Sequence, residues 1–350
     1  MKLVVSSIAV LSLAAAIVQA SSPTLYIFGD SLSDVGTLKE LTLGLVPAQP
    51  YWNGRFSSGP VWNEYLAKLL NFNLYNRAIG GSTSDNDHDT IIDVLNIKIP
   101  STEDQINFFK FTHPLYFLDS TINNDIAVLE VGANDFFAEK TALTNGNITA
   151  TFFTDQLAST VVSQLETMRK IGFKNIVLTN MAAIQNTPMA TTDGIVDMTT
   201  TVVTQYNTKI AAAASAWASK ASGINSFMLS DIGSFVQVTV TSPAIAAALG
   251  LTDVTNACLG VGYDGYSLET LISSAMGIAP TKGVCTDPSN HYFFDDVHPA
   301  ERVQRLFGYY TFTAISAKAQ NTVYELNEAN ILALISQYNL GTPAPKPVAI

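Results

Sequence analysis

The sequence predicts an α/β fold built on a parallel sheet of five strands, with helices covering both faces of the sheet. Five short β-prone runs begin near residues 25, 74, 126, 175 and 224 and alternate with segments of helical apolar spacing. Such an alternation is typical of parallel strands joined by helical crossovers. No internal repeat or linker interrupts the pattern, so we expect a single domain at residues 21–340.

The two ends of the chain lie outside this expected domain. Residues 1–20 contain one Lys, an apolar run and the ending Val18-Gln19-Ala20, which together predict a secretory signal peptide. We therefore expect a secreted, extracellular protein. Residues 341–350 are rich in Pro and predict a flexible tail. No later stretch reaches the roughly 18 uninterrupted apolar residues that a membrane-spanning helix needs.

The composition limits the classes of partner and the redox state. The formal net charge is −11, and it becomes −12 without the leader, which has one Lys and no acid. An acidic chain repels phosphate backbones and anionic lipid, so we expect no nucleic-acid partner and no stable membrane insertion. The two cysteines, Cys258 and Cys285, predict one disulfide in an oxidising compartment, with two buried thiols as the alternative. The sequon Asn147-Ile148-Thr149 predicts glycosylation of Asn147 on a surface loop.

Each of the first three strands ends in a short polar or Gly-rich segment. The first predicted strand, Leu25–Phe28, ends abruptly in Gly29-Asp30-Ser31. After a loop at residues 38–60, the next two predicted strands are Leu74–Ala78 and Ile126–Val131. The helices expected between and after them are Val61–Leu70, Ser101–Phe111 and Thr154–Ile171.

The second half of the chain supplies the remaining strands. They are Asn175–Thr179 and a run near Ile224–Leu229. Residues 230–292 are less regular, and we expect small helices there in an insertion across the top of the domain. The remaining expected helices are a long one marked by apolar positions from Val202 to Trp217, then Pro299–Ala319 and Val323–Tyr338.

Three residues with catalytic potential follow three successive strands. Ser31 follows the first strand, Gly81 the second and Asn134 the third. Because ligands bind beyond the carboxyl ends of parallel strands, we expect all three at one rim of the sheet. Taken singly, each segment also reads as an ordinary turn. A serine hydroxyl becomes a good nucleophile only if a base and an oxyanion site stand beside it.

His298 is the best candidate for the base. Asp295 precedes it by three residues, close enough to fold back and accept the imidazole Nδ1–H, which fixes the tautomer. The alternative is a helix-capping Asp295-Asp296 pair with an incidental histidine. His88 lies in a polar, Asp-rich loop, where a solvated loop is favoured over a metal site, and we expect no metal and no organic cofactor.

A developing oxyanion needs hydrogen-bond donors that are already in place. The available set is the backbone N–H groups of Ser31 and Gly81 and the side-chain amide of Asn134. Gly81 lets the backbone approach a substrate because it has no Cβ. Asp30 and Ser33, by contrast, read as residues that shape the turn.

These segments resemble the GDSL, or SGNH, hydrolase family. The matching blocks stand in the family's order and span nearly the whole chain, although Ser82 follows the glycines where the family often has Ala. The resemblance implies a flavodoxin-like three-layer α/β/α sandwich, the SGNH hydrolase fold, and ester hydrolysis through a serine acyl-enzyme. It also implies the roles of nucleophile for Ser31, base for His298, orienting carboxylate for Asp295, and oxyanion donors for Ser31, Gly81 and Asn134. The four blocks are Phe28-Gly29-Asp30-Ser31-Leu32-Ser33-Asp34, Gly80-Gly81, Gly132-Ala133-Asn134-Asp135 and Asp295-Asp296-Val297-His298-Pro299.

The segment from Phe56 to Trp62 resembles the subgroup that holds secreted fungal carbohydrate acetylesterases, plant-type GDSL lipases and bacterial haemolysin-like acyltransferases. We therefore expect a secreted serine esterase that removes acetyl groups from plant cell-wall oligosaccharides. Two alternatives remain: a lipase or phospholipase acting on longer-chain esters, and a non-catalytic glycan-binding protein on the same scaffold. We expect a monomer that acts on a small ester. Four aromatic residues could either stack against sugar rings or pack in the core: Tyr51, Trp52, Phe56 and Trp62.

Overall fold

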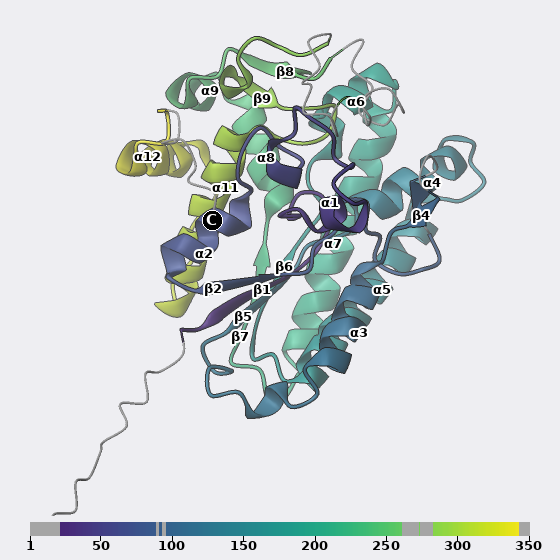
Figure 1. The fold of residues 1–350 in the computed structure, drawn as a ribbon, viewed down its shortest axis with the longest axis vertical. Helices are drawn as coiled ribbons and strands as arrows, with labels where there is room; N and C mark the ends of the chain where they lie inside the picture. Colours follow the sequence, from purple (N-terminus) through teal and green to yellow (C-terminus); the bar gives the residue numbers. More distant parts are fainter. Residues whose placement is uncertain (1–21, 89–90, 93–95, 261–272, 274–282, 343–350) are drawn as a thin grey trace, which may run out of the picture.

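Five parallel strands form the central sheet, in the order β2-β1-β5-β6-β7 (Figure 1). The second strand lies outside the first, and the other three continue on the other side, which is the flavodoxin-like order. Every neighbouring pair is parallel, so the predicted fold class is confirmed. The strands are β1 (Thr24–Phe28), β2 (Asn73–Asn76), β5 (Ile126–Leu129), β6 (Asn175–Thr179) and β7 (Ser226–Ser230).

The chain is seen here in a computed structural model, which describes residues 22–88, 91–92, 96–260, 273 and 283–342. The predicted signal peptide at residues 1–20 lies outside the described residues. The predicted tail at 341–350 lies outside them as well, apart from its first two residues.

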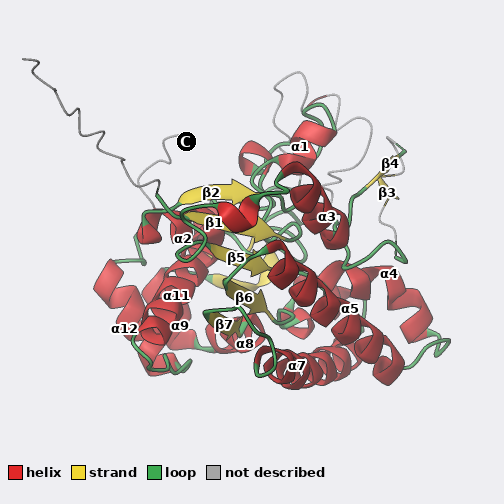
Figure 2. Ribbon diagram, turned by 90° about the horizontal axis from the view of Figure 1, so that it is seen from below, coloured by secondary structure: helices red, strands yellow, loops and turns green. Residues whose placement is uncertain are grey.

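Helices cover the sheet on both faces, which makes three layers (Figure 2). Strand β1 shows why, because its side chains alternate between the two layers: Tyr26 and Phe28 pack in one core, Leu25 and Ile27 in the other. The first core is closed by α3 (Thr102–Thr112), α5 (Ala150–Ile171) and α7 (Val196–Ala218). The second core is closed by α2 (Trp62–Leu70), α8 (Ile232–Thr241), α9 (Pro243–Leu249), α11 (Glu301–Ala319) and α12 (Glu328–Tyr338).

The predicted helices are present, with shifted ends. Ser101 caps α3 through its side chain, and Gly172 ends α5. The last helix, α12, begins five residues later than predicted, because the segment after Val323 is irregular and Val323 itself is exposed. The sequence analysis did not identify three helices, α1 (Thr37–Leu41), α4 (Ala133–Thr144) and α6 (Pro188–Thr192).

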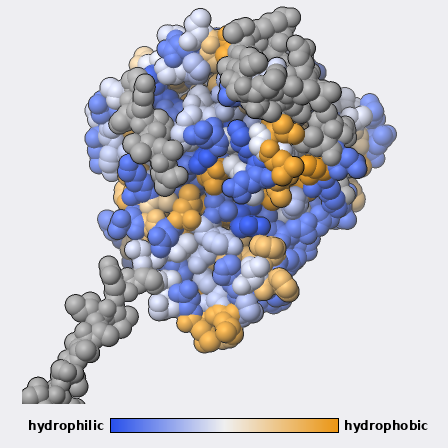
Figure 3. All heavy atoms as spheres, viewed as in Figure 1, coloured by the Kyte–Doolittle hydropathy of each residue, from blue (hydrophilic) through white to orange (hydrophobic). Residues whose placement is uncertain are grey.

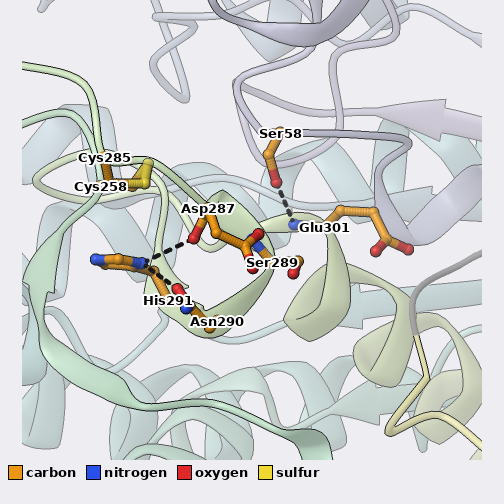
Figure 4. The surroundings of a disulfide bond; sticks show 8 residues. All are labelled: Ser58, Cys258, Cys285, Asp287, Ser289, Asn290, His291 and Glu301. Atoms are coloured by element: carbon orange, nitrogen blue, oxygen red, sulfur yellow. Dashed lines mark hydrogen bonds between the residues drawn. A yellow bond between two sulfur atoms is a disulfide. The ribbon is translucent and has the colours of Figure 1, made fainter.

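Short elements fill the connections. In the irregular stretch predicted as an insertion, β8 (Asp253–Ala257) pairs in parallel with β9 (His291–Phe293), and both lie at the top of Figure 1. Cys258 and Cys285 are joined in a disulfide beside this pair, which confirms the predicted bond (Figure 4). The other short elements are β3 (Ile91–Ile92), β4 (Ile97–Lys98), η1 (Trp52–Gly54), η2 (Tyr116–Leu118), η3 (Ile184–Asn186) and η4 (Pro288–Asn290).

Exposed apolar side chains occur along the α3–η2 segment, which runs from the carboxyl-end rim, where Gln105 meets Gly29, to the start of β5. In Figure 3 the orange surface at the lower end of the molecule lies over this segment. Because η2 precedes β5, the η2 end of the segment lies at the opposite edge from the rim at which β1 delivers Ser31. Its exposed apolar residues are Phe108, Phe111, Leu115, Phe117 and Leu118.

Within the described part of the chain, no single helix has the length and apolar character to cross a membrane. Helices α8 and α9 satisfy the length and composition only as a pair, and they meet at a bend of 87°.

Candidate active site

Ser31, His298 and Asp295 form one chain of hydrogen bonds at the carboxyl-end rim of the sheet. The Ser31 Oγ lies 2.6 Å from the His298 Nε2, and the His298 Nδ1 lies 2.7 Å from the Asp295 Oδ2. With the proton on Nδ1, the imidazole donates to Asp295 and accepts the Ser31 hydroxyl proton through Nε2. Ser31 is 8% exposed, and only 13% of the side chain of each partner is exposed. The arrangement can therefore remove the serine proton in a site with little water.

Asp295 is fixed by more donors than the imidazole. Its Oδ1 accepts the backbone N–H groups of Val297 (2.9 Å) and His298 (2.7 Å), and its Oδ2 accepts the hydroxyl of Tyr51 at 2.6 Å. Burial alone would raise the pKa of Asp295, but the charge and hydrogen bond of His298 and the Tyr51 bond hold that pKa below its usual range. The carboxylate is therefore ionised and correctly placed to stabilise an imidazolium.

The capping alternative for this segment is wrong, because α11 is capped at Ala300 and receives no side-chain bond there. The side chain of Asp296 is exposed, and its backbone oxygen accepts the N–H of Met189. The other histidines lie in contacts of their own. His88 pairs with Glu139 at 3.0 Å, and the ring of His113 stacks on a core phenylalanine.

The fourth histidine, His291, is bound to its own turn. Its Nδ1 lies 2.9 Å from the Asn290 Oδ1 and 3.2 Å from the backbone oxygen of Asp287, close to the disulfide (Figure 4). Across the described residues, no group of three or more His, Cys, Asp or Glu side chains is placed to hold a metal ion.

Each of the three predicted oxyanion donors has a hydrogen that no protein acceptor of the described chain takes up. In the described part of the chain, neither the Ser31 N–H nor the Gly81 N–H donates to a protein acceptor. The Asn134 Nδ2 donates to the backbone oxygen of Ser82 at 3.0 Å, which leaves its second hydrogen available. Asn134 is the second residue of α4, so the positive end of that helix also faces the site. Gly81 has a φ of +89°, a conformation that glycine adopts without strain.

Gln105 and Asp135 fix the loop that carries Gly81. The Gln105 side chain bonds to both backbone groups of Gly29 and donates to the Ser82 Oγ, each at 2.9 Å. Asp135 accepts the N–H and the hydroxyl of Ser84. Sequence reasoning missed both roles, because Gln105 lies on a helix remote in the sequence and Asp135 follows Asn134 in what looked like a turn.

A buried pair of acids, Asp30 and Glu130, lies beneath the nucleophile. The Asp30 Oδ1 accepts the N–H of Leu32, which shapes the turn, and the Glu130 Oε2 accepts the Ser33 hydroxyl at 3.0 Å. Ser33 in turn accepts the indole N–H of Trp62 at 3.1 Å. Burial, and next the charge of Glu130, raise the pKa of Asp30 well above its usual range, and burial also raises the pKa of Glu130. The one signal of this pair in the sequence was Glu130, an acid near the end of the apolar strand predicted at Ile126–Val131.

Of the two readings for the four aromatic residues, core packing holds for Trp62 and Phe56. Trp62 is 1% exposed and Phe56 is 3% exposed, so both belong to the core and neither offers a face to a sugar ring. Phe56 packs against the His298 ring, with 5.1 Å between ring centroids. Tyr51 is partly exposed but its hydroxyl is engaged by Asp295. Trp52 is partly exposed beneath the guanidinium of Arg55.

An apolar cavity opens beside the reactive groups. It has a volume of about 60 Å³, and Ser31, Asn134 and His298 line it together with apolar side chains from several elements. A water takes a share of about 30 Å³ in the liquid, so this is room for about two water-sized groups. The principal apolar lining residues are Leu32, Phe137, Ile184, Phe235, Val236 and Phe307.

The chain is similar in sequence and in fold to several known proteins. The family model described as GDSL-like Lipase/Acylhydrolase matches residues 25–310. The GDSL esterase/lipase APG of Arabidopsis thaliana is 26% identical over 324 residues, which cover 81% of this chain and 88% of that protein. The phosphatidylcholine-sterol acyltransferase of Aeromonas hydrophila is 29% identical over 187 residues, which cover 51% of this chain and 50% of that protein. Among solved structures, Est24, a carbohydrate acetylesterase from Sinorhizobium meliloti, superposes with a TM-score of 0.44 at 11% identity over 85% of this chain and all of Est24.

Proposed function

The chain belongs to the family of GDSL-like lipases and acylhydrolases and is a carboxylic ester hydrolase, and from this premise we propose that Ser31, His298 and Asp295 are its catalytic triad. The observation that carries the proposal is the unbroken hydrogen-bond chain from the Ser31 Oγ through His298 to Asp295, at 2.6 and 2.7 Å.

In the proposed mechanism, the Ser31 Oγ attacks the ester carbonyl while His298 takes its proton through Nε2. Asp295 keeps the imidazole in the required tautomer and stabilises the imidazolium. The N–H groups of Ser31 and Gly81 and the amide of Asn134 donate to the oxygen of the tetrahedral intermediate. His298 then protonates the departing alcohol, and an acyl-enzyme on Ser31 remains. Water, deprotonated by the same imidazole, releases the acid and restores the serine.

The direct test replaces the nucleophile. Ser31→Ala should abolish hydrolysis of 4-nitrophenyl butyrate and labelling by a fluorophosphonate, with an unchanged thermal transition. Turnover by the folded variant would refute the mechanism. Labelling of the wild-type protein also separates an esterase from a glycan-binding protein, because a binding protein has no activated serine.

We propose that the apolar cavity receives the acyl group. An acetyl methyl is about the size of one water, so a cavity with room for about two such groups suits a short acyl chain of about two to four carbons. This favours short-chain esters over the longer-chain esters of the second candidate. The Aeromonas relative, named for phosphatidylcholine, points instead to longer esters, although the chain spans half of that protein's length.

Acetylated cell-wall oligosaccharides remain the other candidate substrate, because an acetyl group also fits the cavity. A series of 4-nitrophenyl esters from acetate to decanoate separates the two candidates. A maximum of kcat/KM at butyrate supports the acyl-cavity proposal, whereas a maximum at acetate, with acetate release from acetylated xylo-oligosaccharides, supports the carbohydrate esterase. Activity that rises through decanoate and extends to phospholipid supports the lipase.

We also propose that the protein is secreted. The pattern of residues 1–20 and the Cys258–Cys285 disulfide support an oxidising, extracellular setting. Asn147 lies exposed in the turn between α4 and α5, a position open to a glycosyltransferase. Amino-terminal sequencing of the protein recovered from the medium should begin at Ser21, and removal of N-glycans should lower its mass.

A further inference from the structure

Asp34 is the most fully hydrogen-bonded acid next to the nucleophile. It lies three residues after Ser31 and is 0% exposed. Its Oδ1 accepts the backbone N–H groups of Gly36 (2.7 Å) and Thr37 (2.6 Å), and its Oδ2 accepts those of Leu38 (3.1 Å) and Gly80 (2.8 Å). One carboxylate therefore joins the start of α1 to the turn that carries Gly81.

The hydrogen bonds along that turn leave one N–H free. Ile79 donates its N–H to the backbone oxygen of Gly29 at 3.1 Å, and Gly80 donates to Asp34. Ser82 donates back to Ile79 at 3.0 Å, which closes the turn. Between these fixed groups, the N–H of Gly81 has no protein acceptor within the described residues. Asp34 thus holds the peptide immediately before the free donor.

The backbone that carries Asp34 is itself rigid. The backbone oxygen of Ser33 accepts the side-chain amides of Asn63 on α2 and Asn76 on β2, each at 2.8 Å. Ser31 and Asp34 therefore belong to one fixed turn, and the bond from Gly80 fastens the second oxyanion segment to it. Resting on the proposed esterase function, we propose that Asp34 is a positioning residue for the oxyanion hole, whose ionised carboxylate sets the place of the Gly81 N–H relative to Ser31.

Only a carboxylate meets this requirement. Four N–H donors converge on two oxygens, so an amide or a carboxylic acid would turn a hydrogen towards at least one of them. Burial raises the pKa of Asp34 to about 6, while the bonds from Gly80, Gly36, Leu38 and Thr37 oppose that rise. The group is therefore ionised at neutral pH although no Lys or Arg of the described chain forms an ion pair with it.

The test compares two variants at Asp34 with a matched control. Asp34→Asn keeps the shape of the side chain and loses the charge. Asp34→Ser keeps one oxygen, which is enough to cap the start of α1 but not to accept the N–H of Gly80 as well. This variant replaces Asp34→Asn in the test if Asp34→Asn does not fold. Glu40→Gln, on the exposed side of α1, removes the same charge without touching the turn. Each protein is titrated with a fluorophosphonate so that kcat refers to active molecules.

We expect both Asp34 variants to lose about 10²-fold in kcat towards 4-nitrophenyl butyrate, because a misplaced oxyanion donor costs about that factor. KM should change less than threefold, and the rate of fluorophosphonate labelling should fall with kcat, since its transition state places charge on the same oxygen. Glu40→Gln should match the wild-type protein.

A folded Asp34 variant with kcat per active site within threefold of the wild-type value would overturn the inference. So would a loss confined to the number of active sites, because that result marks a purely structural role. These outcomes differ from failure of the proposed function, in which the wild-type protein itself would neither turn over the ester nor label at Ser31.

Discussion

Gly80→Ala should damage both stability and catalysis through a single methyl group. A Cβ at Gly80 would lie 2.2 Å from the Cε2 and 2.6 Å from the Cζ of Phe56, and 3.1 Å from the Cδ2 of Leu38. Carbon atoms pack at roughly 3.5–4.0 Å, so the Phe56 ring must move by more than about 1 Å. The ring cannot swing into solvent, because it is 3% exposed and packs between Tyr51 and His298.

The size of the effect follows from where the ring can go. Extra carbon in a packed core costs about 1–3 kcal/mol of unfolding free energy. The Phe56 centroid lies 5.1 Å from that of the His298 ring, so displacement of Phe56 presses on the base. A misplacement of about 1 Å at a reacting group costs about 10²-fold in rate. We expect kcat to fall by about that factor, with a smaller change in KM because the acyl cavity does not include Phe56.

Urea unfolding and steady-state kinetics on 4-nitrophenyl butyrate measure the two effects on one preparation. Gly260→Ala is the matched control, because among the described residues the nearest atom to its new Cβ is the Ala257 backbone oxygen at 3.7 Å, an ordinary contact. The control should stay within about 0.5 kcal/mol of the wild-type protein and keep its kcat. If Gly80→Ala behaved like this control, the argument that the Phe56 ring couples Gly80 to His298 would be wrong.

Two other perturbations have predictable effects. Tyr51→Phe removes a hydrogen bond to the charged Asp295 and raises the pKa of that carboxyl, so it should lower the unfolding free energy at pH 7 by about 1.5–3 kcal/mol. The pKa of Asp295 is depressed in the folded wild-type protein, so this stabilisation is lost as the pH falls through that pKa. Urea unfolding below about pH 4 should therefore show a smaller difference between Tyr51→Phe and the wild-type protein than at pH 7. An equal difference at both pH values would contradict the assignment. Replacing Cys258 and Cys285 by Ala removes a disulfide between residues 27 apart and should lower the unfolding free energy by about 3–4 kcal/mol on the chain-entropy estimate. With dithiothreitol present, the variant and the wild-type protein should have the same unfolding free energy.

The sequence predicted the parts of the site that depend on strand order and local spacing. Ser31, Gly81 and Asn134 each follow a strand, and parallel strands place their carboxyl ends at one rim, so their convergence needed no tertiary information. The pairing of Asp295 with His298 was equally local, because three residues separate them within one turn.

The supporting contacts were not predictable by such rules. Gln105 reaches Gly29 across 76 positions of sequence, and Glu130 reaches Ser33 across 97. Gln105 lies on a helix and shares no strand end, turn or helical repeat with Gly29, so only the packed structure brings those two together. Glu130 follows β5, the neighbour of β1, so strand order places it at the same rim, but its bond to the Ser33 hydroxyl depends on how the turn after β1 folds. The bond from Tyr51 to Asp295 was missed because the two residues are 244 positions apart in the sequence.

The hydrogen bonds of the buried acids around Ser31 give a physical reason for the two aspartates, Asp30 and Asp34, in the turn after β1. Tight turns at the ends of strands leave backbone N–H groups that neither a helix nor a sheet satisfies, and a buried unpaired N–H costs about 1–3 kcal/mol. A carboxylate offers two oxygens and roughly four acceptor sites, whereas serine or asparagine offers one oxygen. Asp34 uses that capacity for four donors, and Asp30 and Glu130 serve the N–H of Leu32 and the hydroxyl of Ser33. Burial raises the pKa of all three acids, because the charged form of each loses the solvation of water. Their hydrogen bonds hold the turn in which, among the described residues, the N–H groups of Ser31 and Gly81 have no protein acceptor.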